Sequence, residues 1–116
     1  MVVSISRGEI WLVSLDPTEG HEIKKTRPAV IIQNDIGNKY SALTIIAPII
    51  SQDTNKVYPF EVLLTPQNAG LEKESKALLN QIRAIDKKRL IKKIGKITTE
   101  TREEIDEALK ISLDLK

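Results

Sequence analysis

The segment Arg27-Pro28-Ala29-Val30-Ile31-Ile32-Gln33-Asn34-Asp35 is a short apolar run with an arginine at its start and a polar turn at its end. Its valine and isoleucines are β-branched and favour an extended, packed backbone, so we expect a strand over residues 27–33. Proline is tolerated at the start of a strand but not in the middle of a central one. We therefore expect Arg27 at the rim of a sheet, beside a polar loop over residues 16–26.

The rest of the chain alternates apolar runs with turn-forming segments. We expect strands over residues 8–15, 27–33, 42–50, 57–64, 75–83 and 94–98. Residues 42–50 are almost wholly apolar, which is typical of a strand buried on both faces, with Pro48 marking a bend or an edge. Asn, Gly and Pro predict turns at 34–38 and 65–71, and residues 86–91 predict a short helical turn.

The last segment predicts an amphipathic helix. Thr101 with Glu104 three residues on forms a capping-box pattern, and Thr98 and Thr99 are alternative caps one turn earlier. An apolar stripe follows at helical spacing, comprising Ile105, Ala108, Leu109, Ser112 and Leu113. Together the segments predict a mainly β fold, a curled antiparallel sheet or partly open barrel of about five to seven strands with a C-terminal α-helix.

Composition limits the class of protein. A chain of 116 residues with 41% hydrophobic and 29% charged side chains predicts one globular domain over residues 1–116. The absence of cysteine excludes disulfides and thiolate zinc sites. No apolar run approaches the roughly 20 residues that span a bilayer, and the start of the chain does not resemble a signal peptide. We expect a cytoplasmic protein with no membrane contact.

Charge is unevenly distributed although the net charge is only +2. A basic cluster consists of Lys87, Lys88, Arg89, Lys92, Lys93 and Lys96. An acidic segment follows, with Glu100, Glu103, Glu104, Asp106 and Glu107. A basic cluster of this kind is suited to nucleic acid or to an acidic protein segment, and the alternative is a solvated face without a partner.

Several short motifs, taken in order, resemble one known family. They are Arg7-Gly8-Glu9-Ile10-Trp11-Leu12-Val13, Leu15-Asp16-Pro17, Gly20-His21-Glu22, Arg27-Pro28-Ala29-Val30, Gln33-Asn34-Asp35, Tyr58-Pro59-Phe60-Glu61-Val62 and Gln81-Ile82-Arg83-Ala84-Ile85-Asp86-Lys87. The ordered set resembles the MazF/PemK (Kid) family of toxin–antitoxin endoribonucleases, and the resemblance runs from about residue 7 to residue 113.

The resemblance implies an SH3-like barrel related to the CcdB toxins. It also implies a homodimer and a metal-independent enzyme, without a cofactor, that cuts single-stranded RNA at short sequences. An acidic, largely disordered antitoxin of the MazE type would block the RNA-binding groove. RNA supplies its own nucleophile, the 2′-hydroxyl next to the scissile phosphate, so the enzyme has to move two protons and stabilise charge on the phosphoryl oxygens.

The resemblance also implies roles for individual residues. Arg27 matches the family's strand-entry arginine, and its guanidinium fits the stabilisation of a phosphate better than proton donation. His21 matches an acid/base histidine of the Kid branch, and the alternative is a loop histidine without chemistry. Glu22 either orients Arg27 or contacts a base edge. The expected RNA-binding residues are Glu22, Lys24, Lys25 and Gln81.

The sequence departs from the family pattern at the end of the apolar strand. Relatives usually carry a catalytic threonine where this chain has Ile50, which neither donates nor accepts a hydrogen bond. Ser51 substitutes only if the strand ends or bulges there, because neighbours on a strand face opposite sides. Leu78 and Asn80 replace the Arg and Asp of the Kid branch. Two hypotheses remain: an RNA-cleaving toxin attenuated by Ile50, or a non-cleaving module that binds RNA or a protein target.

Overall fold

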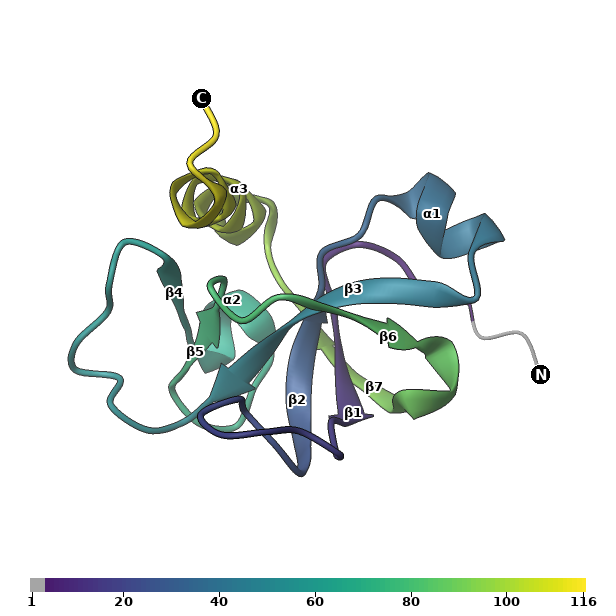
Figure 1. Ribbon diagram of the computed structural model, residues 1–116. Helices are drawn as coiled ribbons and strands as arrows, with labels where there is room; N and C mark the ends of the chain where they lie inside the picture. Colours follow the sequence, from purple (N-terminus) through teal and green to yellow (C-terminus); the bar gives the residue numbers. More distant parts are fainter. Residues whose placement is uncertain (1–3) are drawn as a thin grey trace.

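The computed structural model describes residues 4–116 (Figure 1). Met1–Val3, the first part of the segment that we compared with a signal peptide, lie outside the described residues. The elements are β1 (Glu9–Ser14), β2 (Thr26–Ile31), α1 (Asp35–Tyr40), β3 (Leu43–Ile50), β4 (Glu61–Leu64), α2 (Pro66–Ala69), β5 (Ser75–Leu78), β6 (Arg83–Asp86), the 3-10 turn η1 (Lys87–Arg89), β7 (Leu90–Lys96) and α3 (Thr99–Leu113).

All strand pairs form one curled antiparallel sheet, which confirms the predicted mainly β fold. The strand order is β4-β5-β3-β2-β1-β7, and β6 pairs with the first half of β3. Figure 1 shows β3 crossing the molecule, with α3 above the side that carries β4 and β5 and with α1 at the other end. The long, almost wholly apolar β3 is therefore the strand that joins the two halves of the sheet.

The predicted strand over residues 75–83 is wrong in one respect, because β5 ends at Leu78 and a separate strand, β6, begins at Arg83. β5 pairs with Ile49 and Ile50 at the end of β3, whereas β6 pairs with residues 43–46 at its start. Between these two ladders, residues 78–82 face only residues 47–48 of β3. The surplus residues leave the sheet opposite Pro48, which has no N–H to offer a ladder bond.

Four other segments differ from the sequence prediction. The predicted turn at 34–38 is the start of α1, because the Asn34 side chain caps a helical turn by accepting from the N–H of Gly37 at 2.8 Å. The predicted turn at 65–71 contains α2, which has a capping box formed by Thr65 and Asn68. The predicted strand at 57–64 begins only at Glu61, and the predicted strand at 94–98 starts earlier, at Leu90.

The core has two parts, one on each face of the central strands. One cluster includes Val30, Ala47 and Ile49 and is covered by Ile105 and Ala108 of α3. The other cluster has the members Ile5, Val13, Leu15, Ala29, Ile31, Ile46, Ile85 and Leu90. Because alternate residues of β2 and β3 enter different clusters, both faces of these strands are buried within a single chain.

Helix α3 begins where one of the predicted alternatives places it. The Thr98 side chain accepts from the N–H of Thr101 and is therefore the N-cap, and Thr101 itself is buried. Ile105 and Ala108 face the core, as the helical stripe predicts, whereas Ile111 and Leu113 are exposed. Within residues 4–116, no helix combines the length and the apolar character that crossing a membrane requires.

Candidate functional site

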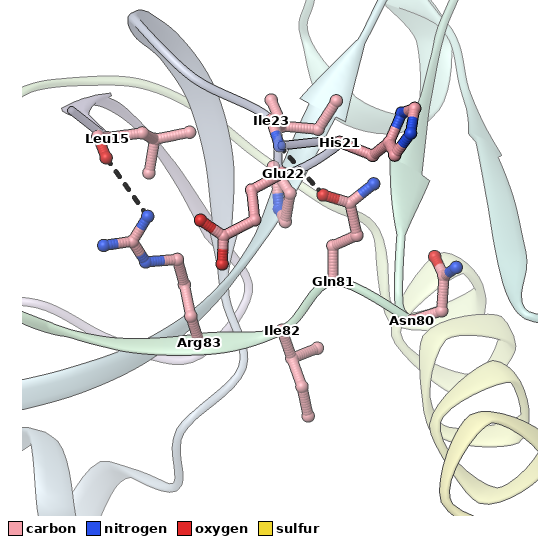
Figure 2. A pocket seen from close by; sticks show the side chains of 9 residues that line it. Leu15, His21, Glu22, Ile23, Asn80, Gln81, Ile82 and Arg83 are labelled. Carbon is pink, nitrogen blue, oxygen red and sulfur yellow. Dashed lines mark hydrogen bonds between the residues drawn. The ribbon is translucent and has the colours of Figure 1, made fainter. Parts of the chain in front are cut away.

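A pocket of about 360 Å³ opens where residues 80–83 meet the loop between β1 and β2 (Figure 2). Its walls are Leu15, His21, Glu22, Ile23, Pro48, Asn80, Gln81, Ile82 and Arg83. The interruption between β5 and β6 creates this pocket, because the surplus residues that leave the ladder opposite Pro48 form one of its sides. We call it the loop pocket.

The loop pocket brings together three of the residues that the sequence singled out. His21 and Glu22 reach it from the exposed loop, and Gln81 reaches it from the opposite wall. The Gln81 side-chain oxygen accepts from the N–H of Ile23 at 3.0 Å, so Gln81 anchors the loop as well as lining the pocket. Figure 2 shows the amide nitrogen of Gln81 on the side of the His21 imidazole. Acid/base, acceptor and donor groups therefore share one cavity.

Arg83 is a pocket residue for which the sequence predicted no role. It is the first residue of β6, it is half-buried, and its Nη1 donates to the carbonyl oxygen of Leu15 at 3.1 Å. Figure 2 shows the Glu22 carboxylate directed toward the side of the pocket that holds Arg83. The sequence does contain a signal for Arg83: it is a cation two residues after Gln81 and at the start of a strand. Functional side chains often lie at the ends of strands.

Arg27 lies at the rim, as predicted, but it does not line the loop pocket. It is the second residue of β2, faces Val13 of β1 in the ladder, and is half-buried. Its Nε donates to the carbonyl oxygen of Lys24 at 3.0 Å, which ties the guanidinium to the end of the loop. Lys24 and Lys25 are exposed next to it, outside the pocket lining.

β3 ends at Ile50, and Ser51, the next residue, lines a different pocket. Ile50 pairs with Lys76 and lines a second pocket of about 430 Å³, which also includes Tyr58 and Glu61. Ser51 instead lines a pocket with Pro28, Lys92 and Lys93. The structure therefore does not bring the Ser51 hydroxyl to the position that the Ile50 side chain occupies.

The second pocket and the loop pocket are neighbours along β3. Pro48 lines the loop pocket and Ile50 lines the second pocket, and residues two apart on a strand project from the same face. The β2–β3 ladder ends at Ala29 opposite Pro48, and the same register carried two residues further aligns Arg27 with Ile50. The two pockets and Arg27 thus belong to one face of the sheet. Within residues 4–116, no three or more His, Cys, Asp or Glu side chains are grouped so that they could hold a metal ion.

Comparison with known proteins identifies the family and the fold. The model of the PemK-like, MazF-like toxins of type II toxin–antitoxin systems matches residues 6–113. The chain belongs to this toxin family. The toxin is 42% identical to Endoribonuclease MazF9 of Mycobacterium tuberculosis over 114 residues, which are 94% of this chain and 96% of the relative.

Solved structures share the fold at lower identity. MazF from Deinococcus radiodurans superposes on this toxin with a TM-score of 0.83 and 24% identity, over 97% of this chain and 99% of that one. An endoribonuclease in complex with its cognate antitoxin, from a mycobacterial species, gives a TM-score of 0.81 and 20% identity over 97% of both chains. These likenesses confirm the curled sheet with a C-terminal helix that the sequence predicted.

Proposed function

We propose that this toxin is an endoribonuclease that cuts single-stranded RNA by attack of the RNA's own 2′-hydroxyl, and that Ile50 slows its cleavage step. The assignment as an RNA-cleaving toxin rests on family membership and on the 42% identical endoribonuclease. These two findings favour cleavage over the alternative of a non-cleaving module. The observation that carries the proposed site is the meeting of His21, Glu22, Gln81 and Arg83 in one pocket.

The residues of this face match the chemical needs of the reaction. An imidazole is the side chain best suited to proton exchange near neutral pH, so we assign acid/base work to His21. Arg27 and Arg83 supply guanidinium groups that fit phosphoryl oxygens through paired hydrogen bonds. The amide of Gln81 and the carboxylate of Glu22 offer donors and acceptors to the edge of an unstacked base. Both proton transfer and charge stabilisation then come from side chains of this chain.

The two neighbouring pockets suggest the path of the strand. An RNA that crosses β3 from the loop pocket to the pocket at Ile50 would run along one face of the sheet and pass Arg27 at its rim. Lys24 and Lys25 are exposed beside this path and add attraction for phosphates. At Ile50 the path meets an isoleucine side chain, so a hydrogen bond that a hydroxyl would give the phosphoryl group is missing there.

The direct test is incubation of the purified toxin with a mixed-sequence RNA in the presence of EDTA. We expect slow cleavage whose products carry a 2′,3′-cyclic phosphate, because 2′-hydroxyl attack leaves that end. Binding should weaken with salt, with a log–log slope of about −0.7 for each phosphate neutralised on a single strand. Lys24→Gln/Lys25→Gln should flatten this slope, whereas Lys116→Gln, a distant exposed control, should not. Metal-dependent cleavage with 5′-phosphate products would contradict the proposed chemistry.

We propose that the toxin's protein partner is an acidic antitoxin. We also propose that the toxin acts in the cytoplasm, where its RNA substrate is found. A structurally similar endoribonuclease has been solved in complex with its cognate antitoxin. The lysines of the loop and of β7 would attract acidic side chains as they attract phosphates. We expect a carboxylate-rich peptide that mimics such a segment to compete with RNA. Additive binding of peptide and RNA would show that they use separate surfaces.

We also propose a homodimer, but on a different ground from the one the sequence offered. The apolar residues of β3 and β4 that suggested a covering partner, such as Ile49, Val62 and Leu64, are already buried within one chain. The side chains that a second copy could cover are instead the exposed Ile36 and Tyr40 of α1 and the exposed end of α3. Sedimentation at micromolar concentration tests this proposal, and a monomer would overturn it.

A further inference from the structure

Two arginines hold the end of β1 where the loop begins. The Nη1 of Arg89 donates to the carbonyl oxygens of Ser14, at 3.1 Å, and of Asp16. The Nη1 of Arg83 donates to the carbonyl oxygen between them, that of Leu15, at 3.1 Å. Successive carbonyl groups of an extended chain point toward opposite edges of the strand. The two guanidinium groups therefore bind the end of β1 from its two sides.

The strand pairing agrees with this geometry. The N–H of Leu15 donates to the carbonyl oxygen of Lys25 on the β2 side, which is therefore the side of Arg83. β7 pairs with the other edge of β1, and Arg89 is the last residue of η1, directly before β7. The Asp86 side chain caps η1 by accepting from the N–H of Lys88 at 2.8 Å and so fixes the turn that presents Arg89.

The loop depends on polar anchors because it buries little apolar surface. Of the residues from 18 to 25, all but Thr18 and Ile23 are exposed, and ordering such a segment costs about 1–2 kcal/mol of backbone entropy per residue. Two further hydrogen bonds to side chains hold it: the N–H of Lys25 donates to the Asp16 carboxylate at 3.0 Å, and the N–H of Ile23 donates to Gln81 at 3.0 Å. Gln81, Arg83 and Arg89 lie close together in the sequence, so one short segment sets the position of the whole loop.

The held loop carries the groups to which we assign the chemistry. His21 and Glu22 lie near its tip, and the Nε of Arg27 is bound to the carbonyl oxygen of Lys24 at its end. A displacement of the loop therefore moves His21 and Glu22 and frees Arg27 at the same time. A misplacement of about 1 Å in groups that act on a reacting bond can cost about a hundredfold in rate.

We infer that Arg89 is a positioning residue of the RNA-cleavage reaction: on the side opposite Arg83, it fixes the 16–25 loop by binding the backbone carbonyls at its start, and it makes no contact with the RNA. This inference rests on the proposed function, in which the loop presents His21 and Glu22. Arg89 belongs to the basic cluster, and its charge alone would suggest that it binds RNA. The inference gives it a structural task instead, the positioning of the loop.

The test compares Arg89→Gln with Lys88→Gln. Both variants remove one positive charge from η1, but Lys88 is exposed and only Arg89 holds the loop carbonyls. The first measurement is amide hydrogen exchange of residues 18–25. The second is the kcat and the KM of RNA cleavage, determined separately in the wild-type toxin and in an Ile50→Thr background. Arg89→Lys keeps the charge and can reach a single carbonyl, so it covers the case in which Arg89→Gln fails to fold.

We expect exchange in the loop to accelerate in Arg89→Gln by about tenfold or more over the control, while the rest of the sheet keeps its protection. The kcat should fall at least about tenfold, with KM within about twofold of the control, and Arg89→Lys should lie between the two. Unchanged loop exchange in a folded Arg89→Gln, or a kinetic effect confined to KM and equal to that of Lys88→Gln, would overturn the inference. Hydrogen exchange can be measured even if the toxin does not cleave RNA. If the wild type is inactive but the loop exchanges faster in Arg89→Gln, the result contradicts the proposed function and not the role of Arg89 in holding the loop.

Discussion

Replacing Ile50 by threonine tests whether a single missing hydroxyl limits the reaction. Ile50 is the last residue of β3, is half-buried, and projects from the same face as Pro48 of the loop pocket. A threonine there would place its hydroxyl on the path proposed for the phosphate, two residues beyond the last β2–β3 pair, Ala29 opposite Pro48. One hydrogen bond of this kind at a developing charge is worth about 2.7–4 kcal/mol, or about 10²–10³ in rate. We expect a gain of at least about tenfold, because the hydroxyl is exposed to some water.

The cost of this change to the fold is small. Threonine keeps the β-branched shape and loses only the outer part of a half-buried side chain, so the free energy of unfolding should fall by about 1 kcal/mol. Ile50→Val is the matched control, because valine has the shape of threonine without the hydroxyl. The difference in cleavage rate between the Thr and Val variants then reports the hydroxyl alone.

The assay is single-turnover cleavage of a mixed-sequence RNA in EDTA, with the wild type, Ile50→Thr, Ile50→Val and Ser51→Ala side by side. Equal rates for the Thr and Val variants would refute the argument that the hydroxyl at residue 50 is the missing group. Full activity of the wild type that disappears in Ser51→Ala would show that Ser51, the residue after β3, supplies the function, contrary to the separation of the two pockets.

Three further predictions follow from contacts elsewhere in the chain. Arg27→Ala should abolish cleavage and weaken RNA binding with little change in melting temperature, because Arg27 lies at a rim; an unchanged cleavage rate would remove it from the mechanism. Lys76→Met should lower the free energy of unfolding by about 3–5 kcal/mol, because the Glu61 carboxylate, 2.9 Å from the lysine nitrogen, would be left buried without its cation. Adding Glu61→Leu should restore most of the loss. Urea unfolding measures both variants, and equal instability of the single and the double variant would exclude this explanation. The pKa of Asp35 is lowered by a hydrogen bond from the N–H of Arg7, by the Asn38 amide and by two nearby arginines. The Asp35 carboxylate therefore binds a proton more readily in the unfolded chain, and the melting temperature should fall as the pH drops below about 3.9. Asp35→Asn should weaken this dependence on acid pH in thermal melts, and an unchanged dependence would show that Asp35 does not contribute to it.

The sequence alone determined the features that arise from local physics. Alternating and β-branched apolar runs predicted the antiparallel sheet, and helical spacing after Thr98 predicted α3 with its buried Ile105. Pro28 predicted a strand start, and Arg27 does lie beside it near the start of β2. Each of these features depends on residues a few positions apart, so the chain's own propensities are sufficient to specify them.

Tertiary structure alone decided how the candidate site is assembled. Residues 75–83 have the composition of one strand, but β3 pairs with residues 76–77 in one register and with residues 83–86 in another, on either side of Pro48. That division brings Gln81 and Arg83 against a loop that lies about sixty residues earlier in the chain. Pairing registers and the meeting of distant segments depend on non-local contacts, which leave no periodic signal in the sequence, and for this reason the positioning arginines became visible only in the folded chain.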